Sequence, residues 1–138
     1  MKCVTIKNPT RNSEIKRIST IAPLVLVSSN TDRIIRQTLN HIHIDSNLFS
    51  NIISSDTDLI SGSFSKEKVF EKLIKGKHPI SIGDRYQTDI LPMLKLGGDG
   101  ILVAGPHELG KVYHALKSNN LEQIEKYYKG SDYNAVNL

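Results

Sequence analysis

Short apolar runs alternate along this chain with longer segments in which apolar residues recur at helical spacing. The run LVLV at 24–27 is typical of a strand buried on both faces, because it is continuous and rich in β-branched residues. Further short strands are predicted within residues 2–7, 47–54, 79–82 and 100–103. The pattern therefore predicts five strands.

The segments between these strands carry helix signals. In the segment 33–42, the residues Ile34, Ile35, Leu39 and Ile42 fit one face of a helix. The predicted helices cover residues 13–20, 33–42, 65–76, 88–96, 107–118 and 120–130. Because strands and helices alternate with short connections, we expect a parallel sheet covered by helices on both faces. We expect one domain over residues 1–130 and a flexible tail over 131–138.

Composition and charge narrow the classes of protein. The 138 residues carry a formal charge of +4, and the lysines and arginines are scattered rather than clustered. This charge suits anionic ligands but favours no nucleic-acid partner, because Tyr127 and Tyr128 are the only aromatic pair. Cys3 has no partner cysteine and is interpreted as a small buried residue. Without a signal peptide or a membrane-spanning run, we expect a cytoplasmic protein with no membrane contact.

In parallel sheets, ligands bind beyond the carboxyl ends of the strands. Ser28 and Ser29 follow a predicted strand and precede a helix, so they form either a phosphate cradle or a capping segment. Lys66 lies in the first turn of a helix, where the dipole disfavours a cation unless an anion is bound. It is interpreted as a phosphate ligand or a solvated side chain, and Lys68 is a competing candidate for the phosphate role.

Two carboxylates follow another predicted strand. Asp84 stands at its end and Asp89 at the start of the next helix. Two ionised carboxylates close together need a cation, and oxygen ligands suit Mg²⁺. The alternative is that Asp84 makes a turn and Asp89 caps a helix.

Three stretches together resemble the motifs of the haloacid dehalogenase (HAD) superfamily of phosphohydrolases. They are LVLVSSN, SKEKVFEKLI and IGDRYQTDILPMLKLGGDGILV, within residues 23–117. The resemblance implies a HAD-like core: a three-layer α/β/α sandwich around a mainly parallel, five-stranded Rossmann-like sheet. It also implies that Ser28 and Lys66 bind the phosphoryl group and that Asp84 and Asp89 hold Mg²⁺.

The chain departs from this family in its first motif, an Asp-x-Asp that supplies the nucleophile. No such pair precedes Ser28, and Lys7 stands in the nucleophile position, where it cannot form an aspartyl-phosphate. We hypothesise that the Lys7 ammonium replaces the metal between Asp84 and Asp89. Asp56 and Asp58 form the one Asp-x-Asp of the chain, and we interpret them as a turn.

The sequence thus leaves three functions open. The first is a noncatalytic protein that binds a phosphorylated ligand or serves as a regulatory or structural subunit. The second is an active Mg²⁺-dependent phosphatase, a phosphoric-ester hydrolase whose nucleophile would come from Asp56 or Asp58. The third, a nucleic-acid-binding module, rests on the basic charge alone. The natural ligand and the oligomeric state are not encoded in any motif that we recognise.

Overall fold

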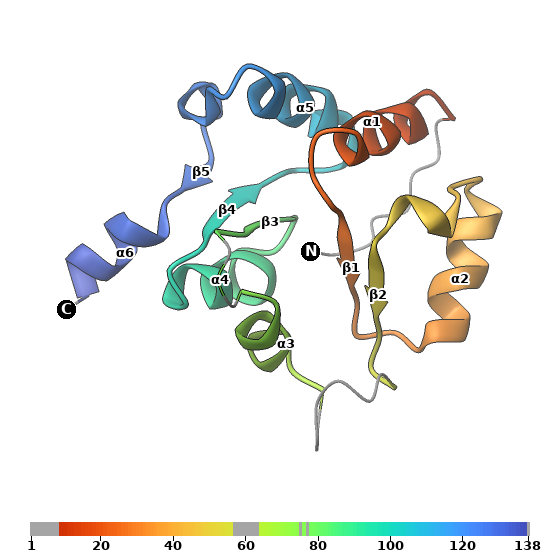
Figure 1. Ribbon diagram of the computed structural model, residues 1–138, viewed down its shortest axis with the longest axis horizontal. Coiled ribbons are helices and arrows are strands. Elements are labelled where there is room, and N and C mark those ends of the chain that lie inside the picture. The colour runs from red at the N-terminus through yellow and green to blue at the C-terminus, as the bar shows by residue number, and fades with distance from the viewer. Residues whose placement is uncertain (1–8, 57–63, 75, 77, 138) are drawn as a thin grey trace.

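The structure is a computed structural model that describes residues 9–56, 64–74, 76 and 78–137 (Figure 1). The helices, in chain order, are α1 (Pro9–Ser19), α2 (Asp32–His41), α3 (Lys66–Leu73), α4 (Leu91–Lys95), α5 (Leu109–Lys117) and α6 (Gly130–Asn137). The strands are β1 (Val25–Val27), β2 (Asn51–Ile53), β3 (Ile80–Gly83), β4 (Asp99–Leu102) and β5 (Tyr127–Tyr128). Short helical turns are η1 (Ser46–Leu48), η2 (Tyr86–Ile90), η3 (Pro106–Glu108) and η4 (Leu121–Gln123).

The described strands form two small sheets rather than one. Strands β1 and β2 pair in parallel, with Leu26 opposite Ile52. Strands β3 and β4 also pair in parallel, and β5 joins the other edge of β4 in the antiparallel direction. Figure 1 shows the β1–β2 pair apart from strands β3, β4 and β5.

The predicted fold class is therefore wrong. The two sheets are not the mainly parallel, five-stranded Rossmann-like sheet of a HAD-like core, and they do not build the expected three-layer sandwich. The physical reason is that apolar runs predict strands locally, whereas pairing depends on contacts between distant segments. The strand predicted within residues 2–7 lies outside the described residues.

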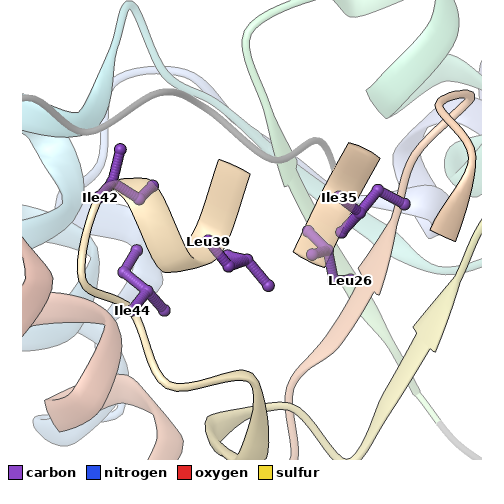
Figure 2. Close-up of a cluster of buried hydrophobic side chains, with 5 residues drawn as sticks. All are labelled: Leu26, Ile35, Leu39, Ile42 and Ile44. Atoms are coloured by element: carbon purple, nitrogen blue, oxygen red, sulfur yellow. The ribbon is translucent and has the colours of Figure 1, made fainter. Parts of the chain in front are cut away.

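Helix α2 covers one side of the first sheet. Its residues Ile35 and Leu39 pack with Leu26 of β1 and with Ile42 and Ile44 beyond the helix, as Figure 2 shows. The predicted apolar face is thus confirmed at three of its four positions, and the fourth, Ile34, is exposed. The N-terminus of α2 binds a distant carboxylate, because the Asp32 amide donates to Asp56 Oδ1 at 3.0 Å.

The second sheet carries the largest local departure from the sequence pattern. Residues 120–130 were predicted as a helix, but they form η4 and then β5, where Tyr127 pairs with Ile101 of β4. A buried carboxylate on β4 fixes this segment: Asp99 accepts hydrogen bonds from the Tyr127 hydroxyl at 2.7 Å and from the Gly130 amide at 3.1 Å. The spacing of apolar residues in 120–130 does not indicate a hydrogen bond to Asp99, which lies outside this segment.

Two predicted boundaries at the ends of the described chain also move. Helix α1 begins at Pro9, where the fixed φ of proline suits a first helical position, so it starts earlier than the helix predicted over 13–20. The segment expected to be a flexible tail contains α6, which contacts α4. Helices α1 and α5 lie side by side (Figure 1).

A second apolar cluster positions the site. It joins Val27 of β1 and Ile53 of β2 to Val69 and Phe70 of α3, together with Met93 of α4. Val27 directly precedes Ser28, and Phe70 lies one turn beyond Lys66. The cluster therefore holds the end of β1 beside the N-terminus of α3.

Candidate functional site

A pocket of about 370 Å³ opens where the end of β1, the N-terminus of α3 and the η2–α4 segment meet. Residues from all three places line it, among them Ser28, Ser29, Asn30, Lys66, Arg85 and Thr88. The three residues predicted to bind phosphate thus share one pocket, although 37 positions of sequence separate Ser29 from Lys66 (66 − 29). The structure brings them together; their role as ligands stays a prediction.

Ser28 and Ser29 contribute to the pocket in different ways. Ser28 is buried, its amide donates to Ile53 O at 3.0 Å, and its Oγ accepts from the Asn30 amide at 3.2 Å. Ser29 is exposed. Ser28 therefore fixes the turn after β1, while the Ser29 side chain faces solvent at the pocket.

Lys66 occupies the first position of α3. Ser65 is its N-cap and accepts a hydrogen bond from the Lys68 amide at 3.4 Å. The Lys66 ammonium lies 2.5 Å from Asp89 Oδ1, and only 13% of its side chain is exposed. Lys68, the competing candidate, is exposed and is not among the pocket residues. The unfavourable placement of a cation at a helix N-terminus is thus offset by a buried carboxylate.

Asp89 has no exposed surface and lies in η2, a π-helical turn between β3 and α4. It also accepts hydrogen bonds from the Arg85 amide at 3.2 Å and from the Thr88 hydroxyl at 3.3 Å. Burial raises the pKa of Asp89, but the hydrogen bond and charge of Lys66, with the Arg85 amide, outweigh burial and hold that pKa below its ordinary value. Asp89 is therefore an ionised partner of Lys66 at neutral pH.

The packing of Asp89 also explains Gly83 at the end of β3. A Cβ atom at Gly83 would lie 2.5 Å from Asp89 Cβ and 2.6 Å from its Oδ2. Glycine is the one residue that leaves room for this carboxylate against the strand. Asp89 therefore packs against Gly83 and reaches Lys66 from within the π-helical turn. Turns of this kind are frequent at functional sites.

The predicted magnesium site stays a prediction. Asp84 is exposed and is not among the pocket residues, whereas both oxygens of Asp89 already accept hydrogen bonds. Mg²⁺ at Asp89 would have to compete with the Lys66 ammonium. Within residues 9–56, 64–74, 76 and 78–137, no group of three or more His, Cys, Asp or Glu side chains is placed to hold a metal ion.

Three residues, Lys7, Asp56 and Asp58, were considered at the sequence level in connection with the nucleophile. Lys7 and Asp58 lie outside the described residues. Asp56 accepts from the Ser54 hydroxyl at 2.5 Å and from the Asp32 amide at 3.0 Å. These bonds lower the pKa of Asp56, and they give the carboxylate a structural role at the N-terminus of α2.

Several pocket residues were not predicted. Arg85 is exposed and brings a second cation, while Asn30, Gln87 and Thr88 bring neutral hydrogen-bonding groups. Their position in the chain was an available signal, because Asn30 follows Ser29 and Arg85 follows a strand end. Whether such neighbours face the pocket depends on the turn, and η2 replaces the regular helix that was predicted there.

Comparisons of the chain with models of protein families, with curated proteins and with solved structures found no match. The resemblance to the HAD superfamily therefore rests on the three sequence stretches alone, and no matched family supports a hydrolase. In the part of the chain that the structure describes, no helix has the length and apolar character needed to cross a membrane.

Proposed function

We propose that this chain is a noncatalytic protein that binds a small phosphorylated ligand in the pocket between β1, α3 and η2. One observation carries the proposal. Residues selected from the sequence as phosphate ligands, Ser28, Ser29 and Lys66, line one pocket with an additional cation, Arg85. Its volume of about 370 Å³ falls in the range of small-molecule sites.

The side chains supply the chemistry that a phosphoryl group needs. The Ser29 hydroxyl donates a hydrogen bond to a phosphoryl oxygen, and the Arg85 guanidinium adds a charged donor with a forked geometry. The Lys66 ammonium has three donors and uses one on Asp89, so two can face a ligand. Asp89 keeps the ammonium in place, because it holds Lys66 at the wall of the pocket before any ligand binds.

The noncatalytic part of the proposal is supported by the state of the buried carboxylate beside the pocket. A phosphatase of the kind first considered needs an unencumbered carboxylate as nucleophile. The buried carboxylate at this pocket, Asp89, is engaged by Lys66, Arg85 and Thr88. Glu67, the carboxylate among the described pocket residues, is exposed in the first turn of α3.

The test is a titration of the ¹⁵N-labelled chain with methyl phosphate, followed by amide chemical shifts. We expect saturable shifts at Ser29, Lys66 and Arg85. The variant Arg85→Gln should weaken binding by about tenfold, because it removes a charged hydrogen-bond donor. Lys68→Gln is the matched control, since Lys68 is also an exposed cation near the pocket and should bind as the wild type does.

A second assay tests the absence of catalysis. Wild type and Asp84→Asn are incubated with an aryl phosphate, with and without Mg²⁺. We expect no turnover above the rate without protein. Metal-dependent turnover that disappears in Asp84→Asn would contradict the noncatalytic proposal, and equal binding by Arg85→Gln and wild type would contradict the pocket.

A further inference from the structure

The charges around the pocket balance one another. Lys66 and Arg85 supply two positive charges, while Asp89 and Glu67 supply two negative ones. This count covers the described residues that line the pocket, together with the Asp89 partner of Lys66. A pocket built for a doubly charged anion would be expected to hold an excess of cations instead.

The two cations are not equivalent. The Lys66 charge is neutralised at 2.5 Å by a carboxylate that has no exposed surface. The Arg85 side chain is exposed and forms no ion pair with any residue within the described ranges. One uncompensated guanidinium therefore faces the ligand, while Glu67 on the same rim repels each additional negative charge.

Neutral donors make up the rest of the polar lining. Ser29, Asn30 and Gln87 contribute hydroxyl and amide donors, and Phe64 and Pro92 contribute apolar surface. Neutral donors satisfy phosphoryl oxygens without demanding a second negative charge. The apolar surface suits an organic substituent on the phosphate, and the volume leaves room for one.

We infer that the pocket binds a singly charged phosphoryl group, as in a small-molecule phosphodiester, in preference to a doubly charged phosphomonoester. This inference rests on the proposed function and specifies its ligand class. Among the described residues that line the pocket, a second charge on the ligand has no uncompensated cation to meet, and it lies near both Asp89 and Glu67. A diester carries one charge and presents two substituents, of which one can lie against Phe64 and Pro92.

The experiment compares dimethyl phosphate with methyl phosphate by amide shifts of the full chain at pH 5 and pH 8. Methyl phosphate gains its second charge near pH 6, whereas dimethyl phosphate keeps one charge throughout. We expect methyl phosphate to bind about tenfold more weakly at pH 8 than at pH 5. This factor corresponds to a rise of about one unit in the pKa of methyl phosphate when it binds. Dimethyl phosphate should bind equally at both, and it controls for titration of the protein.

The variant Glu67→Gln sharpens the test without touching the Lys66–Asp89 pair. It leaves one net positive charge, so it should raise the affinity for methyl phosphate at pH 8 more than the affinity for dimethyl phosphate. Tighter binding of methyl phosphate at pH 8 than at pH 5 in the wild type would overturn the inference and leave the proposed function standing. Absence of binding by both ligands at both pH values would overturn the proposed function itself.

A short single-stranded oligonucleotide in the same titration separates a small-molecule diester from a nucleic-acid backbone. We expect it to bind no more tightly than dimethyl phosphate, because the pocket has the size of a small-molecule site. Much tighter binding, with shifts on faces away from the pocket, would overturn the assignment to a small molecule.

Discussion

Two buried aspartates, Asp89 and Asp99, have similar surroundings and different consequences. Each accepts three hydrogen bonds from described groups, and each has a pKa below its ordinary value although burial alone would raise it. Asp89 pairs with a lysine ammonium from another helix. Asp99 accepts hydrogen bonds from the Tyr127 hydroxyl, the His78 ring and the Gly130 amide. The difference lies in what the partners connect.

The partners of Asp99 join the C-terminal segment to the second sheet. Tyr127 belongs to β5 and Gly130 begins α6, so one carboxylate fixes both elements against β4. The partner of Asp89 lies instead in the wall of a pocket. A buried carboxylate with a lowered pKa is thus not by itself a sign of a functional site. What separates the two is the open volume beside Lys66.

The largest expected effect on stability comes from removing the cation that pairs with Asp89. Lys66→Met leaves the buried Asp89 without its cation, and we expect a loss of about 3 kcal/mol in the free energy of unfolding. Lys68→Met is the matched control and should lose less than about 0.5 kcal/mol, because Lys68 is exposed on the same helix. Urea denaturation measures both.

A double variant tests the cause of that loss. Lys66→Met with Asp89→Asn removes both charges, so it should be more stable than Lys66→Met alone. Equal stability of the single and double variants would show that the ion pair is not what Lys66 contributes.

The next effect probes the close packing behind Asp89. Gly83→Ala places a Cβ 2.5 Å from Asp89 Cβ, and we expect a loss of about 2 kcal/mol from overpacking. Gly110→Ala in α5 is the control, since the nearest atom to its Cβ lies at 3.8 Å and alanine favours a helix. Thermal unfolding should show a lower Tm for Gly83→Ala and an unchanged or higher Tm for Gly110→Ala. Equal behaviour of the two variants would contradict the packing described for Gly83.

A smaller effect on stability is expected at Asp99, because two of its three hydrogen bonds remain when one donor is removed. Tyr127→Phe removes one hydrogen bond and should cost about 1 kcal/mol. Tyr128→Phe is the matched control, since no bond from its hydroxyl to a described residue accompanies its ring contact with Tyr86. Hydrogen exchange should show faster opening of the β5–α6 segment in Tyr127→Phe and not in Tyr128→Phe. Unchanged exchange in both variants would mean that Asp99 does not fix this segment.

The smallest effect is the dependence of stability on acid. The pKa values of Asp89 and Asp99 are lower in the folded chain than their ordinary value of 3.8, so each contributes stability at neutral pH. That contribution is lost as the pH falls below 3.8 and through the folded pKa. Asp99→Asn should therefore lose less stability than the wild type between pH 5 and pH 3, measured by urea midpoints. A steeper loss in Asp99→Asn would mean that the folded pKa is not lowered.

Local features of the fold were readable from the chain. The continuous run at 24–27 predicted β1, and the spacing of Ile35, Leu39 and Ile42 predicted a buried helix face. These features depend on neighbours within a few residues. The helix predicted over 120–130 was wrong because the Tyr127 hydroxyl donates a hydrogen bond to Asp99, a partner 28 positions away.

The candidate site divides in the same way. The sequence alone selected Ser28, Ser29 and Lys66, because a strand end, a helix start and a misplaced cation are local signals. Only the tertiary structure decided that Lys66 binds Asp89, that Asp84 is exposed beyond the pocket, and that Arg85 lines it. It also decided that the strands form two sheets. Pairings of charges and of strands join distant segments, and a pattern read along the chain holds no record of which distant segments meet.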